Sequence, residues 1–347
     1  MADSKKATIK DVAQVAGCSV ASVCYAFSGS DKIREDTRER IFSVARQLGY
    51  VPNRAAQSLS RNPKHIGVVI PDSYDEVMSL FKQGIADAVD SCMRCQLECT
   101  MFGYEWYSAD SQIKALEALL SMPKCDGMIL YLNYGDVDAI RALCDRIQTT
   151  GKPVVCIAMS NPVLPCIATV GVDATGIGAA AADILWSCGC HRASVIAGDF
   201  ATTPMHRENA DGFAQRANEL GLTVTRPGIT YNDADIAYQV TCELLKAETP
   251  DGLFVISYIA EAVCRAVRDC GRTGQVKIVS VDLCNGISTV LENGELVASF
   301  FQDQLEQGWR ATNILTDAMF SSGSPQVNER VNIKPEIVVR ELLKYYN

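Results

Sequence analysis

The segment of residues 8–27 constrains this chain most, because its pattern predicts two short helices joined by a tight turn. Thr8 is a good N-cap, and Asp11 is at the third helical position, where an acid meets the free N–H groups of the first turn. Gly17 supplies the backbone freedom for the turn, and Ser19 can cap a second helix that runs to about Phe27. The pattern therefore predicts a helix-turn-helix, which makes DNA the first partner to consider.

A third helix is expected next, because apolar residues recur at i, i+3, i+4 and i+7 from Ile41 to Leu48 before Gly49 and Pro52 break the pattern. The first two helices can share a small core made by Ile9, Val12, Ala13, Ala16, Val20 and Val23. The alternative is a small helical domain with no partner.

The charge of the chain is divided unevenly. Residues 1–64 hold eleven Lys and Arg against six Asp and Glu, a net charge of +5, whereas the whole chain carries −9. The remaining residues therefore carry −14. A basic head on an acidic protein favours contact with phosphates at one end of the chain.

Beyond residue 65, short apolar segments alternate with amphipathic ones. The expected strands are 66–71, 97–102, 127–131, 154–158, 193–198, 253–257 and 276–281, and the expected helices include 77–92, 111–120, 176–188, 210–219, 235–246 and 260–270. This alternation predicts an α/β body with parallel sheets, whose ligands bind at the carboxyl ends of the strands.

Enzyme signatures are weak. No glycine-rich dinucleotide fingerprint follows a strand, no nucleophile elbow occurs, and the histidines show no metal spacing, so we predict no catalytic residue, no cofactor and no metal. The fifteen cysteines are expected to be reduced core residues; Cys92, Cys95 and Cys99, and Cys188 with Cys190, lack the paired spacing of a zinc site. No leader pattern and no run of eighteen apolar residues occurs, so we expect a cytoplasmic protein with no membrane partner.

Several motifs together resemble the lactose-repressor (LacI) family of bacterial transcription regulators. They are Thr8-Ile-Lys-Asp-Val-Ala, Ala16-Gly17, Thr37-Arg38, Leu48-Gly49-Tyr50, Pro52-Asn53-Arg54 and, more weakly, Ile66–Asp72 and Gln302-Asp303. The resemblance implies an N-terminal all-α helix-turn-helix headpiece plus a two-lobed α/β domain of the periplasmic-binding-protein type, type I, with parallel sheets. The implied division is a headpiece at 1–52, a hinge helix and linker at 53–64 and an effector-binding and dimerisation domain at 65–347. Within that domain, one lobe would hold about 65–165 and 301–323, and the other about 166–300 and 324–341.

The resemblance also implies which residues touch DNA. Val20, Ala21 and Tyr25 would read base edges, but Val20 and Ala21 can recognise only thymine methyls and groove shape. Ser19 and Ser22 would bind phosphates. Three departures from the family pattern are Tyr25, where many relatives carry Arg, Cys24, where a polar residue is expected, and Arg34, where a capping Ser is usual. The full expected set is Thr8, Ser19, Val20, Ala21, Ser22, Tyr25 and Lys32 in the headpiece, and Asn53, Arg54, Ala56 and Leu59 in the hinge.

In the family, the hinge helix works as a symmetric pair in the minor groove, with Leu59 at the place of an apolar wedge between base pairs. That role implies a homodimer on a near-palindromic operator. The alternative is a linker helix in which Leu59 makes one ordinary apolar contact. No apolar heptad tail follows Leu343, so a coiled-coil tetramer is not indicated.

The effector pocket implied by the resemblance departs most from the family. Sugar-binding members carry an Arg where this chain has Asn209, and an Asp where it has Ala158. The expected effector residues are Tyr74, Asn133, Arg207, Asn209, Tyr231, Ser257, Tyr258, Asp282 and Gln302. We expect a repressor controlled by a small molecule, with a sugar favoured by the resemblance. The alternatives are a regulator whose body only dimerises and, with less support, a solute-binding protein or an enzyme.

Overall fold

A computed structural model describes residues 7–27, 33–48, 50, 63–72, 75–92, 97–135, 137–159, 162–283, 286–320 and 328–346. The chain divides into two compact units. One contains residues 1–64 with the short segments 90–98 and 320–325, and the other contains the rest of the chain. We call residues 7–50 the headpiece and the second unit the body.

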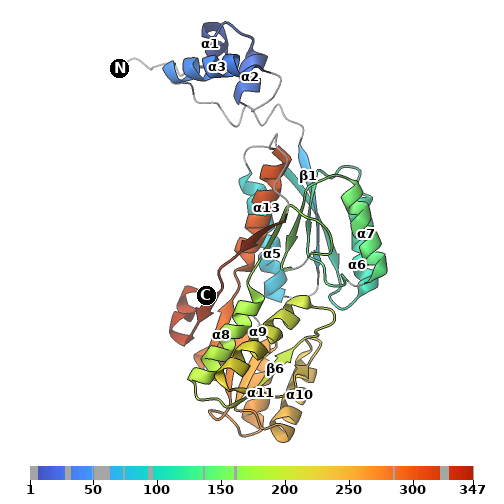
Figure 1. Ribbon diagram of the computed structural model, residues 1–347, viewed down its shortest axis with the longest axis vertical. Coiled ribbons are helices and arrows are strands. Elements are labelled where there is room, and N and C mark those ends of the chain that lie inside the picture. Colours follow the sequence, from blue (N-terminus) through green and yellow to red (C-terminus); the bar gives the residue numbers. More distant parts are fainter. Residues whose placement is uncertain are drawn as a thin grey trace. The chain divides into compact units, whose positions relative to one another are not determined.

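The headpiece consists of three helices, α1 (Ile9–Val15), α2 (Val20–Phe27) and α3 (Glu35–Gln47), which pack together (Figure 1). Their shared core is formed by Val12, Ala13, Ala16, Val23, Ala26, Ile41 and Ala45. The helix-turn-helix is thus confirmed, but among the expected core residues Ile9 is only partly buried and Val20 is exposed. Val20 is 39% exposed because α2 packs through Val23 and Ala26, and Leu48 is 37% exposed because it caps the end of α3.

The first helix begins as its sequence predicts. The Thr8 backbone N–H and hydroxyl both donate to Asp11 Oδ2 at 2.7 Å, and the Asp11 N–H donates back to Thr8 Oγ1. This capping box satisfies N–H groups that would otherwise have no partner in the helix. The cap fixes where α1 starts, and so how it meets α2.

Replacing Thr8 with Ala should loosen α1. We expect a loss of about 1 kcal/mol of local stability, which makes the α1 amides exchange about fivefold faster in the full-length protein. Hydrogen exchange of the α1 peptides measures the effect, with Gln14→Ala, an exposed change on the same helix, as the control. Equal exchange in the two variants would show that the cap does not limit opening of α1.

The first sheet of the body has the strand order β12-β5-β4-β3-β1-β2. The pairings of β1 with β3, β3 with β4, β4 with β5 and β5 with β12 are all parallel. Its elements are β1 (Lys64–Pro71), α5 (Asp75–Ser91), β2 (Leu97–Tyr104), α6 (Ala109–Leu120), β3 (Gly127–Leu130), α7 (Asp138–Thr149), β4 (Val154–Ile157), β5 (Ala168–Gly171) and β12 (Glu329–Asn332). The strands β1, β3 and β4 are almost entirely buried, as expected for a parallel sheet covered on both faces.

The second sheet has the order β13-β11-β10-β9-β6-β7, and β8 also pairs with β6. All its pairings are parallel except the antiparallel pair of β11 with β13. Its elements are α8 (Ala174–Ser187), β6 (Arg192–Ala197), α9 (Pro204–Leu220), β7 (Thr223–Val224), β8 (Gly228–Ile229), α10 (Ala234–Ala247), β9 (Gly252–Ile256), α11 (Ala260–Asp269), β10 (Lys277–Val281), α12 (Ile287–Glu292), β11 (Ala298–Phe301), β13 (Glu336–Val338) and the 3₁₀ helix η1 (Arg340–Tyr345). We call the parts built on the two sheets the first and second lobes.

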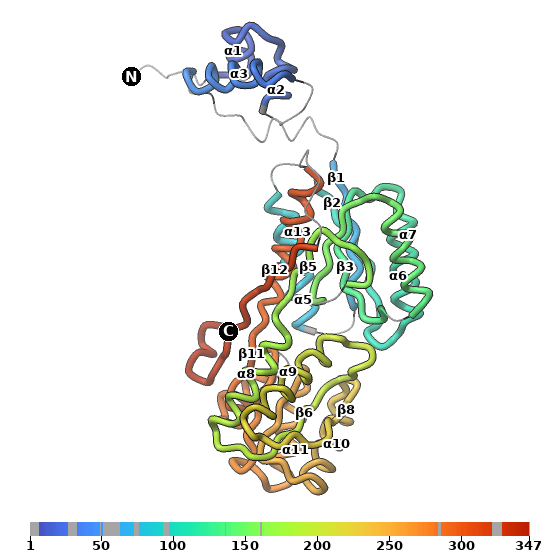
Figure 2. The backbone as a smooth tube through the Cα atoms, viewed as in Figure 1, coloured from blue at the N-terminus to red at the C-terminus, as the bar shows by residue number. Residues whose placement is uncertain are grey.

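The chain passes between the lobes three times (Figure 2). It leaves the first sheet after β5, returns after β11 through α13 (Gln304–Phe320), and leaves again between β12 and β13. Contact of Gly84 with Leu305, and of Gly308 with Phe81, places α13 beside α5 in the first lobe. The expected limits at about residues 165 and 323 were therefore misplaced, because β5 and β12 pair with each other at the edge of the first sheet.

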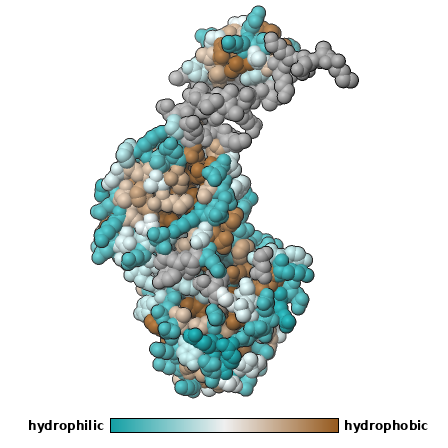
Figure 3. All heavy atoms as spheres, turned by 180° about the vertical axis from the view of Figure 1, so that it is seen from behind, coloured by the Kyte–Doolittle hydropathy of each residue, from teal (hydrophilic) through white to brown (hydrophobic). Residues whose placement is uncertain are grey.

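The surface of the body is consistent with helices that cover the two sheets. Helices whose inner faces cover the sheets should present hydrophilic residues outward, and hydrophilic side chains occupy much of the face shown in Figure 3. Within the described part of the chain, no helix is both long and apolar enough to cross a membrane.

Candidate functional site

The recognition face of the headpiece lies on α2. Val20, Ala21 and Tyr25 are exposed, whereas Val23 and Ala26 point into the core. One side of α2 therefore holds the headpiece together while the residues expected to read bases remain accessible. This is the division that a helix needs if it is to enter a major groove.

Ser19 positions the start of that helix. Its Oγ accepts the Ser22 backbone N–H at 3.0 Å and lies 2.9 Å from the Ser22 hydroxyl. Both side chains are therefore held at the N-terminus of α2, where unpaired N–H groups favour an anion such as a phosphate. Arg34 makes no capping hydrogen bond at α3, as its departure from the family pattern predicted. The predicted contacts Lys32, Asn53, Arg54, Ala56 and Leu59 lie outside the described residues.

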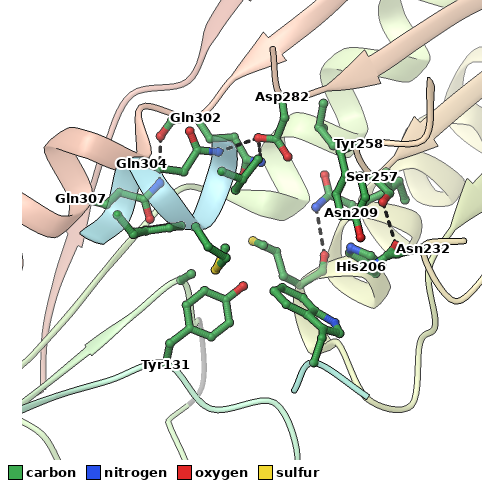
Figure 4. Close-up of a pocket in the computed structure, with 18 residues that line it drawn as sticks. Tyr131, His206, Asn209, Asn232, Ser257, Tyr258, Asp282, Gln302, Gln304 and Gln307 are labelled. Atoms are coloured by element: carbon green, nitrogen blue, oxygen red, sulfur yellow. Dashed lines mark hydrogen bonds between the residues drawn. The ribbon is translucent and has the colours of Figure 1, made fainter. Parts of the chain in front are cut away.

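The body contains a pocket where strands of both sheets end. Tyr131 follows β3, Ala158 follows β4, Ser257 follows β9, Asp282 follows β10 and Gln302 follows β11. The first turns of α5, α9 and α13 supply further side chains (Figure 4). The empty space is about 660 Å³, including the part that is open to solvent.

Three residues that line this pocket have left-handed backbones. Their φ angles are 51° at Ala158, 57° at Asn232 and 68° at Asp282. A residue with a Cβ atom adopts this conformation at an energetic cost, and such strain is concentrated at functional sites. The strain at Ala158 has the least local compensation, because Ala lacks the polar side chain with which Asn and Asp stabilise this conformation.

Asp282 is the charged group of the pocket. It is 8% exposed, and its Oδ1 accepts hydrogen bonds from Gln302 Nε2 at 2.8 Å and Gln304 Nε2 at 2.6 Å. Burial raises the pKa of the Asp282 carboxyl to about 6, although the two amide hydrogen bonds act in the opposite direction. At neutral pH the group is therefore an ionised carboxylate kept in a largely dehydrated place.

Helix α9 contributes the opposite wall through His206 and Asn209. His206 Nδ1 accepts the Gly198 N–H at 3.2 Å, and burial lowers the pKa of the imidazole to about 4. The ring is therefore neutral at pH 7 with its proton on Nε2. Asn209 Nδ2 donates to the Met205 carbonyl at 2.9 Å, while its buried Oδ1 has no hydrogen-bond partner.

The structure brings together some of the expected effector residues and not others. Asn209, Ser257, Tyr258, Asp282 and Gln302 line the pocket, and Asn133 lines a smaller one that shares Tyr131, Ala158 and Met205 with it.

Two expected effector residues lie elsewhere, and a third is not described. Arg207 is exposed and donates to the Phe200 carbonyl, because it occupies the outer face of α9, away from Asn209. Tyr231 is 56% exposed, and its ring makes an edge-to-face contact with that of Tyr107. Tyr74 lies outside the described residues.

Sequence reasoning missed several lining residues. His206 precedes the predicted Asn209 by three positions and so shares its helix face, and this spacing could have identified it. Gln304 and Gln307 come shortly after Gln302 in the chain and lie on α13, a helix that was not among the predicted segments. The lining residues outside the expected effector set are Val77, Met78, Phe81, Trp106, Tyr131, Ala158, Met205, His206, Asn232, Ile256, Val281, Gln304 and Gln307.

The two cysteine groups noted in the sequence hold no disulfide among their described members. Cys99, Cys188 and Cys190 are free thiols, and Cys95 is not described. Burial raises the pKa of the Cys99 thiol to about 11 and that of Cys190 to about 12, so neither is a reactive thiolate at neutral pH. Over the described ranges, no group of three or more potential metal ligands occurs.

Comparison with known proteins gives two family matches. Residues 8–53 match the model "Bacterial regulatory proteins, lacI family", and residues 66–321 match "Periplasmic binding protein domain". The HTH-type transcriptional regulator DegA of Bacillus subtilis is 26% identical over 339 residues, which cover 96% of this chain and 97% of DegA.

Two solved structures show the same fold. GanP, a glucose-galactose binding protein from Geobacillus stearothermophilus, matches with a TM-score of 0.71 at 18% identity, over 81% of this chain and 99% of GanP. The Lac repressor bound to ONPG matches with a TM-score of 0.65 at 20% identity, over 97% of this chain and all of the other. The Lac repressor match spans nearly the whole chain.

Proposed function

The chain belongs to the lacI family of bacterial regulatory proteins, and from that premise we propose how its two units work together. The protein is a DNA-binding transcription regulator with a small-molecule-binding type of body. The finer proposal is a cytoplasmic repressor that binds a near-palindromic operator as a homodimer and responds to an effector in the pocket of the body. The observation that carries it is the pocket itself, built from the strand ends of both sheets.

The pocket position supplies a means of control. A ligand that contacts strand ends of both lobes favours one lobe arrangement over another to the extent that it binds that arrangement better. In this proposal the paired hinge segments, at residues 53–64 of each protomer, grip the minor groove in only one of those arrangements. The effector thus changes operator affinity by a coupling free energy between two sites.

Two alternatives from the sequence are less well supported. A solute-binding protein has no use for the exposed α2 face and its Ser19 cap. A regulator whose body only dimerises does not account for a buried, ionised Asp282 or for three strained residues around one cavity. Both features cost stability, and a ligand site gives a reason to retain them.

Selection of sequences from random double-stranded DNA by the purified protein tests the proposal. We expect a near-palindromic motif, and affinity for it should fall about a thousandfold between about 50 and about 200 mM salt if six or more phosphates are contacted. Enrichment of no motif would remove the operator-specific role.

The variant Tyr25→Ala separates base reading from phosphate binding. We expect it to weaken binding to the selected motif about tenfold or more, because it removes an exposed side chain from the recognition face, while binding to random DNA changes little. Fluorescence anisotropy with both DNAs measures this, and Gln14→Ala, an exposed change on α1, is the control. Equal losses on the two DNAs would contradict base reading by Tyr25.

A further inference from the structure

The pocket has an unbalanced charge. Among the described residues that line it, Asp282 alone carries a formal charge, and none is Lys or Arg. His206, the one imidazole, is neutral because burial lowers its pKa to about 4. A carboxylate or phosphate ligand would therefore meet a buried negative charge with no cation to offset it.

Two amide oxygens in the pocket are acceptors without a hydrogen-bond donor. The Asn209 and Gln307 amide nitrogens donate to the carbonyls of Met205 and Gln302, which can only accept. This fixes both amide orientations and leaves Asn209 Oδ1 and Gln307 Oε1 buried without partners. Each costs free energy unless something donates to it.

The amide donors nearest the acid are committed as well. Gln302 Nε2 and Gln304 Nε2 both bind Asp282 Oδ1, and the Ser257 hydroxyl binds Asn232 Oδ1 at 2.7 Å (Figure 4). The second oxygen of Asp282 receives neither of those amides. Asn209 Oδ1 and Gln307 Oε1 therefore remain as buried acceptors that a ligand could meet.

Aromatic rings close one side of the same space. Phe81 and Trp106 both pack on Tyr131, with ring centroids 5.9 Å and 5.7 Å away. The faces of such rings carry partial negative charge and attract cations, most strongly where water is excluded. An aromatic wall is thus compatible with the sign of ligand that Asp282 attracts.

We propose that the effector carries an ammonium group, which donates to Asp282 and to the amide oxygens of Asn209 and Gln307 beside the aromatic wall. The ligand class is a compact organic amine, and an amino sugar is one form of it. This rests on the proposed role of the pocket as the effector site. Neutral sugars, carboxylic acids and phosphorylated compounds are the competing classes.

Thermal-shift screening followed by calorimetry of the full-length protein tests the class at neutral pH. The probes are a library of primary amines, each paired with its N-acetyl derivative, together with D-glucosamine, N-acetyl-D-glucosamine, D-glucose and D-glucose 6-phosphate. We expect ligands among the amines, with N-acetylation raising the dissociation constant about thirtyfold or more because the charged contact is lost. Ligands that are all neutral or anionic, indifference to acetylation, or no ligand from the library would each overturn the proposal.

Substitutions distinguish the contribution of the Asp282 charge to amine binding from a general loss of structure. Asp282→Asn should raise the dissociation constant of the best amine about thirtyfold or more, whereas Asp183→Asn, which removes a surface carboxylate paired with Arg216, should leave it unchanged. Equal affinity in Asp282→Asn and the parent would also overturn the assignment. Operator binding is measured separately: amine binding without any selected DNA motif would refute the regulator, while a motif without amine binding would refute only the ligand class.

Discussion

Asp282→Asn is expected to raise the free energy of unfolding of the ligand-free protein at neutral pH by up to about 3 kcal/mol. Burial moves the pKa of this carboxyl from 3.8 to about 6, and each unit corresponds to about 1.4 kcal/mol of cost for the charged form. Asparagine keeps an oxygen that can accept from Gln302 and Gln304 and removes the buried charge. Most substitutions at an 8% exposed position destabilise, so the sign is diagnostic.

The dependence on pH gives the same prediction a second test. Below about pH 4 the carboxyl is protonated in both the folded and unfolded states, so its burial costs nothing. Between about pH 4 and pH 6 the folded state holds the proton more tightly, and the wild-type protein loses stability relative to the variant as pH rises. Above about pH 7 the difference is constant.

Urea unfolding across this range measures the difference. His206, whose pKa is lowered from 6.5 to about 4 on folding, adds a pH dependence that both proteins share and that cancels in the difference, and the raised pKa of Tyr131 keeps it from titrating in this range. The free energy of unfolding of Asp183→Asn should differ little from that of the wild type at any pH in this range, since Asp183 lies on the surface. A wild-type protein more stable than Asp282→Asn at neutral pH would contradict the account of a carboxylate kept for binding.

Gly178→Ala is expected to have the second large effect, a decrease of about 3 kcal/mol in the free energy of unfolding. A Cβ at Gly178 on α8 would lie 1.9 Å from the Asn209 carbonyl oxygen on α9, and one at Gly212 would lie 2.1 Å from the Thr175 carbonyl oxygen. Both contacts are with backbone, which cannot move aside as a side chain can. The two helices must separate, and α9 carries His206 and Asn209 with it.

The pocket should therefore weaken together with the fold. Thermal unfolding and amine titration of Gly178→Ala measure the two effects, and Asn218→Ala, on the exposed face of α9, should stay within about 0.5 kcal/mol of wild type. Unchanged stability in Gly178→Ala would show that α8 and α9 are not held at this distance in solution.

Local patterns predicted the headpiece and the sheet interiors well. Thr8 and Asp11 form the cap expected from their spacing, and strands such as Val154–Ile157 are short, apolar and buried. The segment Glu329–Asn332 could not be recognised in the same way, because it is a polar edge strand that exists only through its pairing with β5. Such pairing depends on the rest of the sheet, which a local pattern does not contain.

In the pocket, too, some residues were predictable from local patterns and others were not. Ser257 and Asp282 were predictable because each follows an apolar strand, where ligands of parallel sheets bind. Gln304 and Gln307 lie on α13, a helix that the local pattern did not predict, although the family resemblance placed residues 301–323 in the first lobe. Arg207 was expected in the pocket but lies outside it. Successive residues of a helix are turned by about 100°, so a side chain two positions before Asn209 lies on a different face of α9.

The central claim is that a ligand in the body controls binding of the headpiece to DNA. Its most direct test is anisotropy of the selected operator with increasing amounts of the best amine, in wild-type protein and in Asp282→Asn. We predict that the amine shifts operator affinity of the wild type by about fivefold to a hundredfold, within the usual range of allosteric coupling, and that Asp282→Asn requires far more amine for the same shift. Operator affinity that stays constant while calorimetry shows the pocket filled would contradict the claim.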